Sequence, residues 1–288
     1  MTPPLTTPAE LAAALESATP PTVLDVRWRV GLGADRAGYD AGHLPGAVFI
    51  DLDRDLAAAP GPGRHPLPAP AAFEAAMRAA GVRADRPVVA YDAADATSAA
   101  RAWWLLGWFG HPAPLVLDGG LAAWAAAGLP LVGDVPAPVP GDFRAVPGGR
   151  RVLDAEGAAE LAGDGVLLDA RAPARYRGEV EPIDPVPGHI PTARNAPADA
   201  NVGPDRRLLS PAVLAERFDA LGVTAASPVV TSCGSGVTAC FTSLAMRVAG
   251  LPDPILYPGS YSDWSRAGLP VAVGPEPGEP PAGQPTSG

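Results

Sequence analysis

The sequence of 288 residues contains no lysine, so arginine supplies all 21 of its Lys-plus-Arg cations. A nucleotide-binding P-loop requires a lysine after its glycines, and this class of site is therefore excluded. Any site that binds an anion has to be built from arginine, histidine and backbone N–H groups. The formal net charge of −10 also argues against nucleic acid or an anionic membrane surface as a partner.

Cysteine is nearly as scarce, since Cys233 and Cys240 are the only two in the chain. If both flank one short helix, they are too far apart to form a disulfide. This usage predicts a reduced, cytoplasmic protein. The N-terminus lacks the basic and apolar segments of a signal peptide, and no run of about 18 apolar residues could span a bilayer. No His/Cys cluster has metal-ligand spacing, so we expect neither a metal nor an organic cofactor.

The chain repeats itself after about 140 residues, a shift too long for a solenoid repeat. The sequence VLDVR at 23–27 recurs as LLDAR at 167–171, and PVVAYD at 87–92 corresponds to PVVTSC at 228–233. Further matches follow in the same order, including a DGG…W…GLP segment that returns as PGS…W…GLP. The repeat indicates that the chain is an internal duplication.

The duplication predicts two homologous domains, 1–135 and 150–275. A linker rich in Pro and Gly would join them at 136–149, and a polar, disordered tail would follow at 276–288. Within each half, short apolar strands alternate with helical stretches rich in Ala and Leu. This pattern predicts an α/β fold in which each domain is a mostly parallel sheet flanked by helices. Ligands bind such folds where strands lead into helices.

Cys233 lies at such a strand end, because the apolar VVTS before it reads as a buried strand and the residues after Val237 read as a helix. Gly234 and Gly236 permit backbone angles that turn successive N–H groups into one concavity. The following helix adds the positive end of its dipole. A cysteine in this setting would be held as a reactive thiolate, although cysteines are also common as small buried residues.

The corresponding turn of the first half resolves this choice. It has Asp92 in place of Cys233 and lacks both glycines. A residue that only fills space would tend to recur in both halves. The contrast therefore predicts that the second half is specialised for chemistry while the first half keeps the scaffold.

The Cys-Gly-Ser-Gly-Val-Thr-Ala loop, the GHLPGA and GHIP segments and the DGG…W…GLP segment resemble tandem rhodanese-domain sulfurtransferases over nearly the whole chain. The resemblance implies that the first domain is catalytically silent, with Asp92 at the silent position. It implies that Cys233 cycles through a persulfide, with no cofactor. The substrates would be a small-molecule sulfur donor and a thiol or cyanide acceptor, and a thioredoxin-like reductant is a candidate partner.

The resemblance favours 3-mercaptopyruvate as the donor, because that branch of the family carries the uncharged Cys-Gly-Ser-Gly-Val-Thr loop. Thiosulfate enzymes tend to carry Arg and Lys there, and thiosulfate stays an alternative donor. The predicted substrate-binding residues are one arginine and four residues of the loop: Arg175, Gly234, Gly236, Val237 and Thr238.

A second family arginine is replaced by Ile183 in this chain. Arg177 and Arg194 are the candidates to take over its role in holding the donor anion. The substitution is the reason why the loop alone does not decide between the two donors.

The resemblance also implies a proton relay through the loop serine, a first-domain histidine and an aspartate. Ser235 and His43 match the first two, and Asp35 or Asp40 would be the aspartate. His43 has a competing structural interpretation, because His189 occupies the equivalent position of the second half.

Two other functions use similar residues. A phosphatase with a cysteine on the same turn needs an arginine six positions later, where this chain has Ala239. A persulfide carrier without efficient turnover would need the same residues as the enzyme, so the sequence leaves that alternative open.

Overall fold

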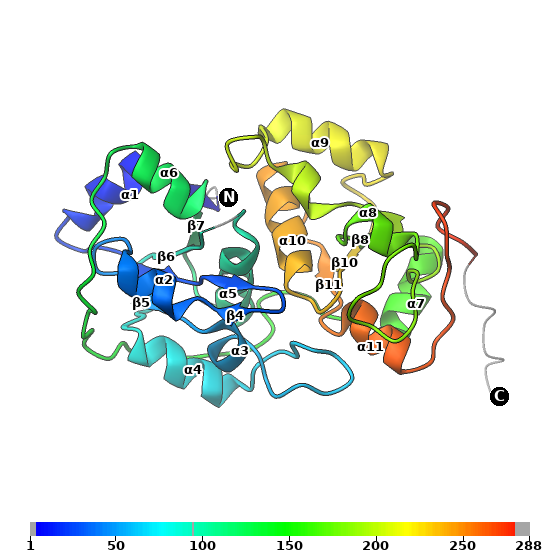
Figure 1. The fold of residues 1–288 in the computed structure, drawn as a ribbon, viewed down its shortest axis with the longest axis horizontal. Coiled ribbons are helices and arrows are strands. Elements are labelled where there is room, and N and C mark those ends of the chain that lie inside the picture. The colour runs from blue at the N-terminus through cyan, green and yellow to red at the C-terminus, as the bar shows by residue number, and fades with distance from the viewer. Residues whose placement is uncertain (1–3, 94, 280–288) are drawn as a thin grey trace.

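The computed structural model describes residues 4–93 and 95–279. It consists of two similar halves that lie side by side, each with a parallel sheet between helices (Figure 1). This architecture confirms the α/β fold predicted from the alternation of apolar runs and helical stretches.

The first half is built on a five-stranded parallel sheet with the order β1-β7-β6-β2-β5. Along β6, Val88 and Ala90 pack on the face covered by α4 and α5, while Val89 and Tyr91 pack on the face covered by α1 and α6. Because both faces are buried, the strand reads as a continuous apolar run. The strands are β1 (Leu5–Thr6), β2 (Thr22–Asp25), β5 (Val48–Phe49), β6 (Val88–Tyr91) and β7 (Pro114–Leu117), with an antiparallel hairpin of β3 (Trp28–Arg29) and β4 (Gly33–Ala34). The helices are α1 (Pro8–Leu15), α2 (Arg36–Ala41), α3 (Leu52–Asp55), α4 (Pro70–Ala79), α5 (Thr97–Trp108) and α6 (Gly120–Ala126).

The second half repeats this plan with a four-stranded parallel sheet of order β11-β10-β8-β9. Helices α7 and α11 pack on one face, and α9 and α10 pack on the other. The strands are β8 (Val166–Asp169), β9 (Arg194–Asn195), β10 (Val229–Ser232) and β11 (Ile255–Leu256). The helices are α7 (Ala155–Asp164), α8 (Pro173–Tyr176), α9 (Pro211–Ala220), α10 (Thr238–Val248) and α11 (Ser260–Arg266), with a 3₁₀ turn η1 at Ala198–Asn201. Among the described helices, none is long and apolar enough to cross a membrane.

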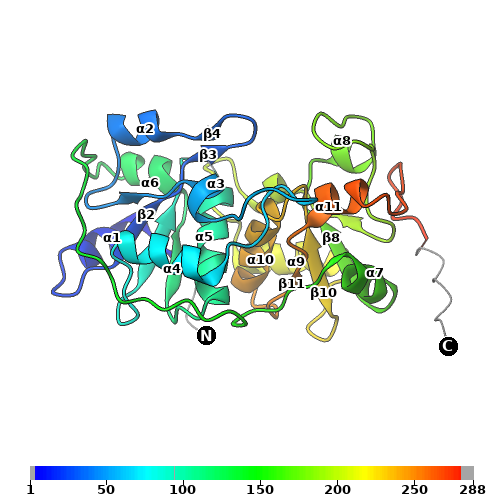
Figure 2. The same ribbon diagram turned by 90° about the horizontal axis from the view of Figure 1, so that it is seen from below.

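The two halves meet where α5 packs against α10 near the centre of the molecule (Figure 2). Trp103 and Leu106 of α5 belong to the same buried cluster as Phe241 and Leu244 of α10. Because apolar surface from both sheets is buried in this one cluster, the hydrophobic effect fixes the position of one half against the other.

Arg101 of α5 is fully buried at this junction. Its Nη2 donates to the carbonyl oxygens of Leu56, His65 and Pro66 at 3.0–3.3 Å, and its Nη1 donates to Gly236 O at 3.3 Å. The first three acceptors lie in the segment 57–66 of the first half or directly before it. We call this segment the 57–66 loop. The fourth belongs to the turn after β10. One side chain therefore holds a loop of one half against the turn of the other.

The connecting segment has neither helix nor strand from residue 133 to 149, and it runs along one side of the molecule (Figure 2). At its end, the Arg150 guanidinium lies 3.8 Å from the centre of the Trp103 ring. At the other end of the second half, Pro277 O accepts a hydrogen bond from the Thr192 N–H. The contacts of the second half thus continue past residue 275, where its predicted boundary lies. The predicted disordered tail from residue 280 onwards lies outside the described residues.

We expect Arg101→Met to lower the free energy of unfolding by about 3 kcal/mol, because four buried carbonyl groups lose a charged donor. Urea unfolding at neutral pH measures this change. The control is Arg83→Met, which breaks exposed ion pairs with Asp85 and Asp142 and should cost about 1 kcal/mol or less. Equal stabilities of the two variants would show that Arg101 does not hold the halves together.

Candidate active site

A cavity of about 460 Å³ opens between the two halves at the carboxyl end of β10. This is the strand end at which the sequence placed Cys233. The first half contributes Trp28, Arg29 and Arg64 to the wall of the cavity. The second half contributes Arg175, Cys233 and Ser235. Gly234, Val237 and Thr238 also line it, so the structure brings these predicted substrate-binding residues together.

The turn after β10 is shaped around the sulfur of Cys233. The Gly236 N–H donates to Cys233 Sγ at 3.1 Å, and the Cys233 N–H donates to Ser260 Oγ at 3.1 Å. Gly236 has φ +78°, and a Cβ there would lie 2.4 Å from Pro258 O, so only glycine fits this position. The cysteine is only 2% exposed, which leaves the cavity as its route to a reactant.

The corresponding turn of the first half holds a negative charge. There the Asp92 carboxylate accepts hydrogen bonds at 3.0–3.1 Å from the N–H groups of Ala96, Ser98 and Ala99, at the start of α5. The first N–H groups of a helix have no partner within the helix and favour an anion. The first half fills its own anion site with a carboxylate, whereas the second half presents a sulfur at the equivalent position.

Ser235 belongs to a chain of three polar side chains that crosses from one half to the other. Its Oγ lies 2.7 Å from His65 Nδ1, and His65 Nε2 lies 3.1 Å from Asp53 Oδ1. Trp28 Nε1 donates to the second oxygen of Asp53 at 2.8 Å. With Nε2–H donated to Asp53, the Nδ1 atom of His65 is free to accept the Ser235 proton.

Burial and, to a smaller extent, the nearby Arg101 guanidinium together lower the pKa of His65 from its ordinary value of 6.5 to about 4. The ring is therefore neutral at neutral pH. A neutral imidazole that accepts from a hydroxyl can remove a proton and return it, which is the function of a general base and acid.

The structure places His43 elsewhere and corrects its predicted role in the relay. Its ring nitrogens lie 2.8 Å from Tyr39 O and 3.1 Å from Asp134 O, and the ring stacks on Tyr39. His189 makes the equivalent contacts in the second half, with Tyr176 O and Glu276 O. The repeated histidine is thus a structural residue that anchors a loop to the backbone.

The aspartate expected in the relay is also corrected. Asp35 accepts from the Gly38 N–H and caps α2, and Asp40 forms an exposed ion pair with Arg36. The carboxylate that contacts His65 is instead that of Asp53. The sequence signal that could have narrowed the choice is that His65 and His111 lack a histidine counterpart in the second half, unlike His43.

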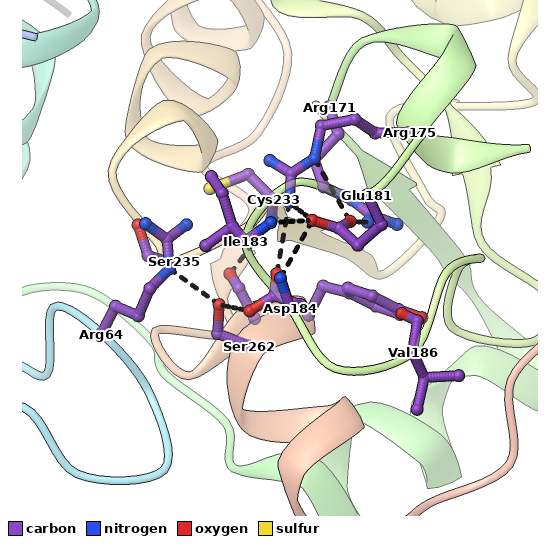
Figure 3. Close-up of polar contacts among 12 residues, drawn as sticks. Arg64, Arg171, Arg175, Glu181, Ile183, Asp184, Val186, Cys233, Ser235 and Ser262 are labelled. Carbon is purple, nitrogen blue, oxygen red and sulfur yellow. Dashed lines mark hydrogen bonds and ion pairs between the residues drawn. The ribbon is translucent and has the colours of Figure 1, made fainter. Parts of the chain in front are cut away.

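Arg175 lies at the cavity as predicted, but its charge is already neutralised. Its Nη2 lies 2.6 Å from Glu181 Oε1 and 3.2 Å from Asp184 Oδ2. Arg171 is paired in the same way with Asp169 and Glu181. The residues around these arginines are shown in Figure 3.

The two arginines proposed to compensate for Ile183 do not reach the cavity. Arg177 pairs with Glu179 at the surface, and Arg194 donates to Leu221 O. The cavity instead receives Arg64 from the 57–66 loop, a residue that sequence reasoning missed. Its Nε donates to Ser262 Oγ at 2.9 Å (Figure 3).

In the part of the chain that the structure describes, no group of three His, Cys, Asp or Glu side chains is placed to hold a metal ion. The polar side chains that line the cavity are four arginines, several hydroxyls, one thiol and the two carboxylates of Asp95 and Asp199, so its cations outnumber its anions. Such a set can bind an organic anion and stabilise a negatively charged sulfur.

A protein-family model described as "Rhodanese-like domain" matches this chain twice, over residues 7–127 and 154–267. The "Probable 3-mercaptopyruvate sulfurtransferase" of Pseudomonas aeruginosa is 47% identical over 283 residues, which cover 94% of this chain and 98% of that protein. The "Putative thiosulfate sulfurtransferase SseB" of Mycobacterium tuberculosis is 41% identical over 268 residues, which cover 91% and 93% of the two chains.

The solved structures agree with these matches. The crystal structure of SseA from Escherichia coli, whose description concerns 3-mercaptopyruvate sulfotransferases, superimposes with a TM-score of 0.81 at 32% identity. The alignment covers 90% of this chain and 99% of SseA.

The shifted pKa of His65 predicts a pH-dependent stability. Between pH 6.5 and 4 the unfolded chain binds a proton at this residue that the folded chain does not, so stability falls as the pH falls through this range. The loss amounts to about 3 kcal/mol from this residue. We expect His65→Gln to show a correspondingly weaker dependence in urea unfolding across that range. An unchanged pH dependence in the variant would contradict the neutral ring.

Proposed function

The chain belongs to the rhodanese family and is a sulfurtransferase, and from this premise we propose that Cys233 takes the sulfane sulfur of 3-mercaptopyruvate and passes it to a thiol. The observation that carries the proposal is the turn after β10. It directs the Gly236 N–H to Cys233 Sγ and opens onto a cavity lined by arginines.

In the first step the Cys233 sulfur attacks the sulfur of the donor. A bond forms between the two sulfurs, the donor's carbon–sulfur bond breaks, and its electron pair stays on carbon as the enolate of pyruvate. The enolate takes up one proton, and Cys233 keeps the transferred sulfur as a persulfide. In the second step a thiol attacks the outer sulfur, which restores Cys233 and yields the acceptor persulfide.

Ser235 and His65 supply the proton transfer that this sequence of steps needs. The Ser235–His65 pair accepts the proton of the Cys233 thiol as it attacks and returns it to the enolate carbon. No net proton has to come from solvent. Asp53 holds the imidazole in the tautomer that accepts from Ser235.

Thiosulfate is the second candidate donor, because one of the relatives carries that name. Attack on its outer sulfur releases sulfite, which leaves as an anion and needs no proton. With thiosulfate the relay would take the proton of the Cys233 thiol but would have no carbon to return it to, whereas 3-mercaptopyruvate uses both proton transfers, and this favours 3-mercaptopyruvate. A persulfide carrier would use the same cysteine but would stop after one transfer. For the acceptor, we propose a thiol, including that of a thioredoxin-like protein in a cytoplasmic setting.

Cys233→Ser is expected to abolish turnover with either donor, by more than about 10,000-fold, because it removes the nucleophile. The matched control is Cys240→Ala, whose thiol is fully buried and donates to Gly236 O. Steady-state pyruvate release with dithiothreitol as acceptor measures turnover, and intact mass spectrometry detects one added sulfur atom. Retained activity in Cys233→Ser overturns the mechanism, and a single burst in the unchanged protein identifies a carrier.

Ser235→Ala is expected to slow pyruvate release from 3-mercaptopyruvate by about 100-fold, because the enolate loses its proton source. Thiosulfate turnover should change much less, since sulfite leaves unprotonated. The ratio of kcat/KM for the two donors, measured on the same preparations, reports this difference. A parallel loss with both donors would show that Ser235 does not deliver the proton to the enolate.

A further inference from the structure

Of the arginines that line the cavity, Arg64 and Arg29 form no ion pair within the described chain, and Arg64 is the one that is partly buried beside Gly234, the residue after the nucleophilic cysteine. The Nε group of Arg64 donates to Ser262 Oγ, while its Nη1 and Nη2 make no hydrogen bond or ion pair to any described residue. The neighbouring Arg175 is neutralised by two carboxylates. The Nη1 and Nη2 groups of Arg64 are therefore available to bind an anion in this cavity.

The hydrogen bond from Arg64 Nε to Ser262 fixes the direction in which the Nη1 and Nη2 groups of Arg64 point. Ser262 Oγ accepts from Arg64 and donates to Asp184 Oδ1 at 2.5 Å. The hydroxyl thus separates the guanidinium from the carboxylate, which is engaged by Arg175 and Ser262. Burial lowers the pKa of Arg64 from its usual range, which reflects the cost of placing this cation out of water.

The loop that carries Arg64 is held against the second half on both sides of the residue. Before it, a Cβ on Gly63 would lie 3.2 Å from Gly259 Cα, and Arg266 donates to Pro62 O at 2.8 Å. After it, His65 Nδ1 lies 2.7 Å from Ser235 Oγ. Figure 3 shows Arg64 entering the site from this first-half loop, while Arg175 comes from α8. The guanidinium therefore has a defined position although its backbone is in a connection rather than in a helix or strand.

Arg64 and Arg175 converge over the residue that follows the nucleophile. A Cβ built on Gly234 would lie 2.8 Å from Arg64 Nη2 and 3.4 Å from Arg175 Nη1. Because Arg175 is paired with carboxylates and Arg64 is not, an anion bound at this point would gain its charge-assisted contact from Arg64. The missing side chain of Gly234 leaves that point open beside Cys233.

We propose that Arg64 binds the carboxylate of the 3-mercaptopyruvate donor through its Nη1 and Nη2 groups and thereby supplies the anion recognition that Ile183 does not provide. This inference rests on the proposed function and names the residue that recognises the donor. A carboxylate matches the planar edge of a guanidinium in a two-point contact. The second half provides the nucleophile, and the first half provides the cation that aligns the donor with it.

The test separates donor binding from every later step. Arg64→Met keeps the length of the side chain and removes the charge, and it should lower kcat/KM for 3-mercaptopyruvate by about 10- to 100-fold, the loss of a charge-assisted contact. The kcat/KM for dithiothreitol, a neutral acceptor that reacts after pyruvate has left, should stay unchanged. Arg64→Lys restores the charge without the planar edge and should recover part of the loss.

Direct binding gives a second readout that does not depend on turnover. In the Cys233→Ser background, 3-mercaptopyruvate binding by isothermal titration calorimetry should weaken by the same 10- to 100-fold when Arg64→Met is added. The control is Arg83→Met, which removes an exposed arginine paired with Asp85 outside the cavity. It should leave both the donor constants and the binding affinity unchanged.

The outcomes distinguish this inference from the proposed function. If the unchanged protein fails to release pyruvate from 3-mercaptopyruvate, the proposed function is wrong. If it turns over and Arg64→Met has the same donor kcat/KM and the same affinity, only the role of Arg64 is wrong. Equal losses for the donor and for dithiothreitol would show that Arg64 serves the docking of the halves, which also overturns the inference.

Discussion

The active site depends on the buried guanidinium of Arg101, which donates to carbonyl oxygens of both halves. It holds the backbone around His65 against the turn that carries Cys233, so it sets the distance at which Ser235 meets the imidazole. The same charge helps to keep that imidazole neutral. The Arg101 guanidinium thus has a chemical effect besides its structural one, because a nearby cation lowers the pKa of a histidine.

The duplication explains how the active-site residues are divided between the two halves. Both halves keep the parallel sheet and the turn that leads into a central helix. In the first half the helix N-terminus is occupied by Asp92, whose carboxylate satisfies the N–H groups permanently. In the second half the glycines and Cys233 leave the equivalent position for a sulfur that can gain and lose a partner. The first half contributes to the cavity the side chains of Arg64 from its 57–66 loop and of Trp28 and Arg29 from its hairpin.

The sequence could predict features that depend on local pattern, and it could not predict those that depend on docking. Apolar runs and the repeat indicated the fold, and the glycine-flanked Cys233 indicated the strand end at which the cavity opens. His65 and Arg64 approach that cysteine from a Pro- and Gly-rich connection and Asp53 from the short helix α3, and the packing of α5 on α10 brings them there. His43 was misleading because its motif is repeated, and a repeated motif marks the scaffold of both halves.

The convergence of Arg64 and Arg175 over Gly234 has a consequence for how this protein evolves. A chain reduced to its second half would keep the nucleophile but lose the proton relay and the unpaired guanidinium together. With the proposed role of Arg64, donor choice depends on a connection that lies more than 160 residues before the reactive cysteine in the sequence. A loop of this kind tolerates substitution without disturbing a sheet, so substrate preference can change while the sulfur chemistry stays intact.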